Sequence, residues 1–197
     1  MSNSGNVYAA NYDGFYWINT SNNNGGLIQW ATLYSNQFLF THGIAVDGID
    51  NVYTYGIGNY IQTFEVVRYS LADGSVTVLS KPVARTLIDS PYGVTVDASG
   101  NVYFVSKDAG TVSKIDKTGN ITTLAGGFNL PGNLAVDLVG NVYVADTGNS
   151  AIKKISSSGV VTTIGNGFSE PQGVAVDQYG NVYVADTGNN QLKKIFA

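Results

Sequence analysis

The sequence predicts an all-β chain in which one short strand unit is repeated along its length. The tripeptide Asn-Val-Tyr recurs with spacings of 45, 50, 40 and 40 residues. Each later copy follows an apolar run that ends in Asp, and no segment has the apolar period of an amphipathic helix. The five copies begin at Asn6, Asn51, Asn101, Asn141 and Asn181.

The last two repeats show how one unit converts into strands. Gly173–Asp177 is a short apolar run typical of a buried strand, and the segment that begins at Asn181 is the next strand. The linker between them starts with Asp and has Gly near its end. It favours a hairpin, because Asp accepts hydrogen bonds from the turn and Gly adopts the left-handed conformation. Gln191–Ile195 is the expected third strand, and Gly159–Ile164 shows the alternating Val, Thr and Ile of a fourth.

The unit is therefore four antiparallel strands in about 40 residues, with apolar residues on both faces of the sheet. Such a sheet cannot hide its surface alone, whereas radial stacking lets each sheet cover its neighbour. We therefore expect a β-propeller of four-stranded antiparallel blades, formed by residues 1–197 as one domain. A β-sandwich is the alternative, because regular strand spacing also fits that class. The expected repeats cover approximately residues 1–40, 41–85, 90–127, 130–167 and 170–197, with fourth strands at Gly26–Leu33 and Gly74–Leu79 in the first two.

The stretch Glu170–Ile195 carries a specific pattern: Pro-x-Gly-Val-Ala-Val-Asp, then Gly-Asn-Val-Tyr-Val-Ala-Asp-Thr-Gly-Asn-Asn, then Lys-Lys-Ile. It resembles the NHL repeat almost position by position, and Asn141–Ile155 resembles it nearly as well. The chain is thus similar to the NHL-repeat β-propeller family, as a bacterial NHL repeat-containing protein. The resemblance is weak over Asn11–Phe40 and Tyr55–Arg85. It implies the fold and says little about function.

The two ends of the chain leave the blade count open. The first repeat starts at its second strand, and the last stops after its third strand at Ala197, so the expected blades hold 3, 4, 4, 4 and 3 strands. The chain is a piece of a longer propeller, a small ring with two incomplete blades, or a chain whose ends a partner completes. Open blade faces and unpaired edges favour association. We expect a fragment or self-association in preference to a closed monomeric ring.

The composition argues against several classes of partner. Lys and Arg total 10 against 14 Asp and Glu, a formal net charge of −4, whereas nucleic acids and anionic membranes select for basic surfaces. The absence of cysteine excludes disulfides, thiolate metal sites and cysteine nucleophiles. The polar start, Met1–Asn6, shows no signal peptide. Localisation stays open, with a secreted or cell-surface place within a larger protein as one alternative.

His42 is the only histidine, and it occupies the repeat position of Tyr92 and Gln172. Because this position precedes the innermost strand, we expect all three near one mouth of the central channel, as candidates for ligand binding. The family resemblance implies a further role for His42: related propeller lyases, such as streptogramin lyase, place histidines near their channel sites, and peptidylglycine amidating lyases bind a metal there. Such metal-dependent lyases need several His or Glu groups that converge. His42 is therefore a weak catalytic candidate beside the alternative of a solvated loop histidine, and no metal or cofactor is expected.

Six aspartates recur at fixed places in the repeat. This favours structural turn residues over a cation site, because a ligand site usually breaks the symmetry of a repeat. They are Asp47, Asp97, Asp137, Asp177, Asp146 and Asp186. Lys114, Lys154 and Lys194 recur in the same way. We interpret them as a solvated strand face that protects the blade edge, with RNA binding, as in animal NHL domains, as the alternative.

The irregular segments carry a second group of candidates for recognition. Asn11–Ile18 departs from the repeat and is rich in aromatic residues, of which Tyr12, Tyr16 and Trp17 are the candidate ligand-binding side chains. Exposed aromatic and amide groups give rigid contact area and hydrogen bonds. Loops that break a repeat often carry function, although sequence drift in a tolerant repeat gives the same pattern.

No nucleophile-elbow, zinc-protease, Walker or Rossmann motif is present. The sequence therefore favours a non-enzymatic interaction module that presents loops and a channel mouth to a protein, a glycan or a small ligand. The alternative is a lyase-like propeller enzyme of the streptogramin-lyase or amidating-lyase type, which would use the histidine at the channel mouth. Membranes and, on charge, nucleic acids are not expected partners, whereas a second copy of the chain is one candidate.

Overall fold

The structure is a computed structural model of the 197-residue chain. It describes residues 6–11, 14–19, 24–29, 38–49, 51–58, 63–79, 83–84 and 91–197. Within these ranges the chain is all-β apart from two short 3-10 turns, and its strands form five antiparallel sheets. None of the helical segments in these ranges has the length and apolar character needed to span a bilayer.

The sheets follow one another along the chain. The first holds β1 (Asn6–Asn11), β2 (Gly14–Asn19) and β3 (Asn24–Gln29). The second holds β4 (Phe38–Val46), β5 (Asn51–Gly58), β6 (Thr63–Ser70), β7 (Val76–Val78) and a short β8 (Val83–Ala84). The third holds β9 (Pro91–Val96), β10 (Val102–Ser106), β11 (Thr111–Ile115) and β12 (Ile121–Gly126). The fourth holds β13 (Leu134–Val136), β14 (Val142–Asp146), β15 (Ala151–Ile155) and β16 (Val161–Ile164). The fifth holds β17 (Pro171–Val176), β18 (Val182–Asp186) and β19 (Gln191–Ile195).

The register of the hairpins divides each repeat between two faces. In the fifth sheet Val182 pairs with Ile195, and Tyr183 pairs with Lys194. Equivalent residues pair in the same register in the third and fourth sheets. Successive side chains of a strand point to opposite faces, so Val and Ile lie on one face and Tyr and Lys on the other. The repeated sequence therefore presents two different surfaces, one toward each neighbouring sheet.

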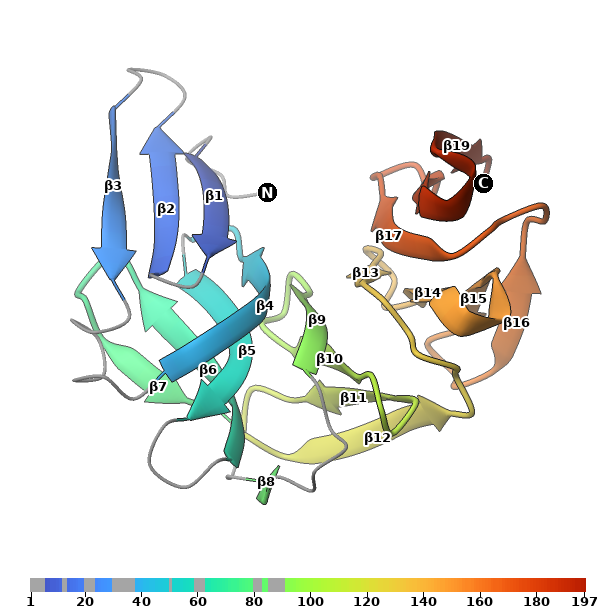
Figure 1. Cartoon of the computed structure of the whole chain (residues 1–197). Helices are drawn as coiled ribbons and strands as arrows, with labels where there is room; N and C mark the ends of the chain where they lie inside the picture. The colour runs from blue at the N-terminus through green and yellow to red at the C-terminus, as the bar shows by residue number, and fades with distance from the viewer. Residues whose placement is uncertain are drawn as a thin grey trace.

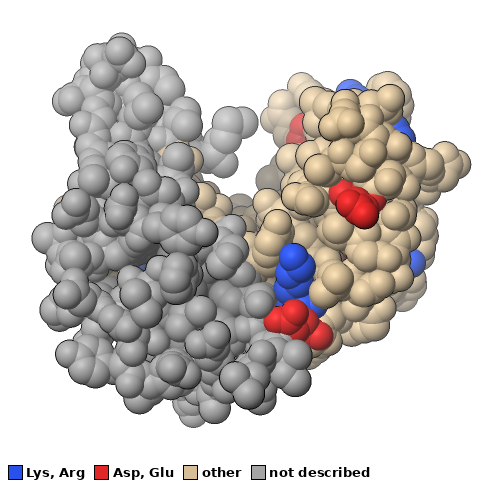
Figure 2. Space-filling view, viewed as in Figure 1, with Lys and Arg blue, Asp and Glu red and all other residues tan. Residues whose placement is uncertain are grey.

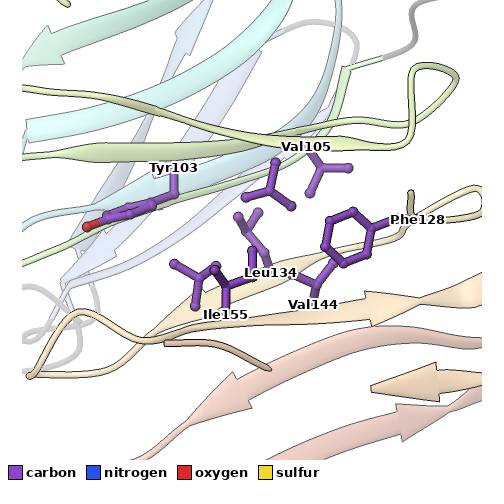
Figure 3. Close-up of a cluster of buried hydrophobic side chains, with 8 residues drawn as sticks. Tyr103, Val105, Phe128, Leu134, Val144 and Ile155 are labelled. Carbon is purple, nitrogen blue, oxygen red and sulfur yellow. The ribbon is translucent and has the colours of Figure 1, made fainter. Parts of the chain in front are cut away.

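Separate apolar clusters fill the junctions between consecutive sheets. Between the third and fourth sheets, Tyr103 and Val105 pack with Leu134, Val144 and Ile155, as Figure 3 shows. The side chains of Val105 and Val144 are 0% exposed. Burial on both faces explains why the strands read as continuous apolar runs in the sequence.

The sheets follow one another around an arc, with β4, β9, β13 and β17 on its concave inner side (Figure 1). In each of these sheets the chain starts at the inner strand and steps outward. This arrangement confirms the predicted all-β propeller of four-stranded antiparallel blades, with three strands in the first and last blades. The second sheet differs by one short additional strand, β8, which pairs with β6.

Local differences from the expected strands have physical reasons. β3 begins at Asn24 rather than Gly26, because Asn24 pairs with the last residue of β2. The turn after β14 contains a 3-10 turn, Thr147–Asn149, and Ser150 rather than a glycine takes the left-handed conformation, with φ of 49°. Gly148 is needed there for another reason: a Cβ atom would lie 2.6 Å from Asn129 Cγ.

Candidate functional site

The aspartate that follows each inner strand is the centre of a hydrogen-bond network within its own blade. Asp97 Oδ1 accepts from the backbone N–H groups of Ser99 and Asn101, both at 2.9 Å. Asp97 Oδ2 accepts from Asn101 Nδ2 at 2.7 Å and from the Tyr103 hydroxyl at 3.0 Å. The other blades with this residue repeat the arrangement around Asp47, Asp137 and Asp177. Both oxygens of each carboxylate are therefore engaged inside the hairpin.

In this network the tyrosine hydroxyl is protonated and the aspartate carboxylate is ionised. Burial, followed by the hydrogen bond to Asp47, raises the pKa of Tyr53 to about 12. Burial also raises the pKa of Tyr103. The Asn181 side chain, which donates to the carboxylate, lowers the pKa of Asp177. At neutral pH the tyrosine is thus a proton donor and the aspartate a charged acceptor, which is the stronger kind of hydrogen bond.

A second aspartate, at the end of β14 and β18, fastens the loop that leads into its blade. Asp146 is 0% exposed, and its Oδ1 accepts from the backbone N–H of Asn129 at 2.8 Å. Asp186, also 0% exposed, accepts in the same way from Ser169 at 2.7 Å. Asp186 additionally forms an ion pair with Lys193 at 2.6 Å. These two carboxylates therefore fix the loops that carry the chain to β13 and β17.

The recurring lysines lie over the recurring tyrosines. The Nζ atoms of Lys114 and Lys154 are 5.5 Å and 5.4 Å from the ring centroids of Tyr103 and Tyr143, and Lys194 repeats the contact in the last blade. Cation–π contacts at this distance are favourable but weak at exposed sites. On the face shown in Figure 2, charged side chains of the described residues are scattered and form no patch of one sign.

The inner strands are irregular at the position that the sequence singles out. In β4, Thr41 pairs with Gly56 and Gly43 with Tyr55, so His42 is an extra residue. Gln172 is the extra residue of β17 in the same way. β9 has the same irregularity between Pro91 and Val94, where Tyr92 lies. A β-bulge re-aims a side chain and is common beside active and binding sites.

The fourth blade has a glycine at this position, and the reason is close contact between neighbouring inner strands. Gly132 donates its N–H to Ala145 O at 2.7 Å, while Ala145 donates to Asn133 O at 3.0 Å, which repeats the irregular pairing. The N–H of Asn133 donates across the blade junction to Gln172 O at 2.9 Å. A Cβ on Gly132 would lie 2.6 Å from Gln172 O. The backbone therefore ties the bulges of these two blades together.

Two residues that the sequence analysis did not name belong to this inner rim. Lys107 Nζ lies 4.3 Å from the centroid of the Tyr92 ring. Asn133 is exposed beside Gln172, which is also exposed. Asn133 stands where other repeats have Gly, and this departure from the pattern was the available signal. No sequence pattern indicated Lys107, because its partner Tyr92 lies fifteen positions away in the sequence.

Part of the expected site lies outside the described residues. Tyr12 is not described, and for Tyr16 and Trp17 in β2 and His42 in β4 the structure describes the strand but not the side chain. Among the described residues, no three His, Cys, Asp or Glu side chains form a group suited to a metal ion. The inner rim is therefore defined by Tyr92, Lys107, Asn133 and Gln172, together with the backbone position of His42.

Two grooves lie at the opposite ends of the inner strands, between the hairpins of adjacent blades. One has a volume of about 760 Å³ and is lined by Asp47, Arg68 and Asp97 among others, and the next has about 550 Å³. The carboxylates of Asp47 and Asp97 at the first groove are engaged in the hairpin networks. Arg68 donates to Thr77 Oγ1 at 3.2 Å, and its buried Nε has no hydrogen-bond partner among the described residues.

Comparison with known proteins supports the fold assignment. The NHL repeat model matches residues 168–195. The fold is similar to virginiamycin B lyase from Staphylococcus aureus, with 14% identity over 100% of this chain and 68% of that chain, and a TM-score of 0.69. It is also similar to an auxiliary nutrient binding protein from Bacteroides thetaiotaomicron, with 15% identity over 93% of this chain and 53% of that chain, and a TM-score of 0.70. A luciferin-regenerating enzyme has 14% identity over 100% of this chain and 70% of that chain, and a TM-score of 0.71.

The chain spans only part of the length of these structures, 53% of a streptogramin B lyase and 68% of the S. aureus lyase. No curated protein sequence matches it significantly. At these identities the likeness to solved structures concerns the fold and leaves the activity open. The matched repeat at residues 168–195 and the shared fold together support a β-propeller built from NHL-type repeats.

Proposed function

We propose that the chain is a non-enzymatic binding module whose ligand contacts the bulged starts of the inner strands. The proposal rests on the contrast between constant and variable positions of the repeat. The Asp, Asn and Tyr of each hairpin recur and bind one another. The bulge position, in contrast, holds a different residue in each blade: His42, Tyr92, Gly132 and Gln172. Variable side chains on a constant frame are typical of a recognition surface.

The chemistry of the inner rim suits a neutral polar ligand. Tyr92 provides an aromatic ring with Lys107 beside it, and Asn133 and Gln172 provide exposed amide groups. Aromatic rings and amides are the groups that paratopes and sugar sites use for contact area and hydrogen bonds. A glycan or an extended peptide offers both an apolar face and regularly spaced polar groups. Auxiliary nutrient binding proteins, which share the fold, are named for binding.

A binding screen with matched variants tests the proposal. The purified chain is applied to an oligosaccharide array and to an array of short peptides. We expect at least one retained ligand, whose dissociation constant rises about tenfold or more, ~1.4 kcal/mol, in Tyr92→Ala and in Gln172→Ala. Thr162→Ala, at an exposed position of β16, is the control and should leave binding unchanged. Retention of no ligand, or equal affinity in all three variants, contradicts the proposal.

An enzyme of the lyase type is the second candidate. It is favoured by one observation: the only histidine of the chain is the extra residue of the β4 bulge, the equivalent of Tyr92. Imidazole is the side chain best suited to move a proton at neutral pH. Incubation with virginiamycin B tests this candidate. Turnover that His42→Ala abolishes would replace the binding proposal with a lyase, whereas absence of turnover removes the candidate for this substrate.

A further inference from the structure

Two loops beside the inner rim hold a non-glycine residue in a backbone conformation that favours glycine. Leu130 has a φ of 43° and Glu170 a φ of 44°, and each directly precedes the proline that leads into an inner strand. The left-handed backbone is unfavourable for these residues, because their Cβ atom lies too close to the following carbonyl oxygen. Glycine would avoid this cost. The backbone of each loop therefore gains nothing from the side chain at this position.

Main-chain hydrogen bonds hold both loops in this conformation, whatever side chain they carry. In each loop the preceding residue donates its N–H to the buried aspartate at the end of the second strand, and its carbonyl accepts from a glycine N–H at 2.8 Å. These partners are Asn129 with Asp146 and Gly148, and Ser169 with Asp186 and Gly188. Strained residues persist where their surroundings fix them in this way, and they cluster at ligand contacts.

The two side chains are exposed and take little part in the fold. Leu130 is 49% exposed with a described blade on either side, so the exposure belongs to the position itself. Glu170 is exposed as well, and its backbone N–H donates to Ser150 Oγ at 3.4 Å. Among the residues that the structure describes, no hydrogen bond or ion pair engages the Glu170 carboxylate. Both side chains are therefore available to a ligand.

The two loops enter the inner rim side by side. Their inner strands, β13 and β17, are neighbours (Figure 1), and a Cβ atom on Gly132 would lie 2.6 Å from Gln172 O. Leu130 is two residues before Gly132, and Glu170 is two residues before Gln172, which is at most ~7 Å of chain. The exposed amide groups of Asn133 and Gln172 therefore have an apolar side chain and a carboxylate nearby.

We infer that Leu130 and Glu170 determine the specificity of the inner rim, whose ligand is an extended peptide with an apolar and a basic side chain. The inference rests on the proposed binding function. The neutral polar backbone of a peptide suits the amide groups of Asn133 and Gln172, which both donate and accept hydrogen bonds. An apolar side chain of the peptide packs on Leu130, and a Lys or Arg side chain pairs with the Glu170 carboxylate. A peptide carries all three kinds of group on one backbone, whereas a neutral glycan lacks the cation.

Peptide binding by charge variants tests the role of Glu170. The purified chain is applied to an array of end-blocked hexapeptides, and the dissociation constants of retained peptides are measured by fluorescence anisotropy. The retained peptides should combine Lys or Arg with an apolar residue. Glu170→Gln should raise their dissociation constants about fivefold or more and weaken the dependence of binding on salt. Glu170→Lys should shift retention toward peptides that contain Asp or Glu.

A matched pair of leucine variants tests the role of Leu130. Leu130→Gly should raise the same dissociation constants about fivefold, because the apolar contact is lost. Its urea midpoint should stay close to that of the wild-type chain, since relief of the left-handed backbone offsets the lost partial burial. Leu138→Gly is the control: Leu138 is 78% exposed in a hairpin turn, so its replacement should leave binding unchanged. A midpoint that falls for Leu130→Gly as for a buried leucine assigns the side chain to the fold and overturns its role.

The outcomes separate this inference from the proposed function. Peptides whose binding Tyr92→Ala weakens, but Glu170→Gln and Leu130→Gly do not, overturn the inference and leave the binding module in place. Retention of oligosaccharides alone, amino sugars included, likewise overturns the peptide assignment and supports binding at the rim. Retention of neither peptides nor oligosaccharides overturns both proposals. Circular dichroism of each variant shows that the blades are retained.

Discussion

The matched positions Ile152 and Leu192 allow one prediction to be worked out in detail. Ile152→Ala removes three carbon atoms from a side chain that is 0% exposed between the fourth and fifth blades. The lost transfer free energy is about 0.8 kcal/mol per carbon, or ~2.4 kcal/mol in total. The cavity that remains adds to this, so we expect a loss of about 3–4 kcal/mol in the free energy of unfolding. Leu192→Ala, at a site that is 76% exposed, should change it by less than about 0.5 kcal/mol.

Urea unfolding followed by circular dichroism measures both changes, at a concentration where the chain has the mass of one molecule. The transition midpoint of Ile152→Ala should fall with an unchanged slope, and that of Leu192→Ala should stay in place. Equal losses in the two variants would refute the reasoning, because stability would then follow the position in the repeat and not the coverage by a neighbouring blade. A loss below about 1 kcal/mol for Ile152→Ala would refute the packing assigned to the junction.

Three further predictions concern the loops and the inner rim. Asp146→Ala should cost about 1–3 kcal/mol in the same urea assay, because the backbone N–H of Asn129 and the side-chain amide of Asn149 lose their acceptor. Gly132→Ala should destabilise the chain and shift backbone NMR signals at Gln172, since the new Cβ would lie 2.6 Å from Gln172 O. Burial alone would raise the pKa of Asp186. The hydrogen bonds from Lys193, Asn189 and Ser169 outweigh burial and lower this pKa to about 2. The stability from this carboxylate is therefore full above the unfolded pKa of about 4 and is lost as pH falls toward 2. In acid unfolding, Lys193→Met should remove part of that pH dependence.

The hairpins could be predicted because their causes are local. Asp137 and Asn141 are four residues apart, and their hydrogen bonds close the turn within that span. The strands on either side have apolar runs whose meaning does not depend on distant residues. Gly140 has a φ of 84°, the left-handed conformation expected from its place in the turn. These short-range causes recur in each repeat, which is why the fold class followed from the sequence.

The inner rim could be predicted only in part. The shared position of His42, Tyr92 and Gln172 followed from alignment of the repeats. The bulge at that position did not, because it depends on how an inner strand pairs with its neighbour. The contact between Lys107 and Tyr92 joins the turn after β10 to the bulged start of β9, and neither residue belongs to the constant part of the repeat.

By itself, the sequence determined the strand unit, its turns and the need of each sheet for neighbours on both faces. Only the tertiary structure decided which faces have those neighbours. Ile152 and Leu192 occupy the same place in almost identical repeats, yet one is fully buried and the other is exposed. Hydrogen bonds and side-chain alternation act over a few residues, so the local sequence encodes them. Burial depends on which other sheet lies against a face, and the residues of that sheet lie outside the local segment that forms the face.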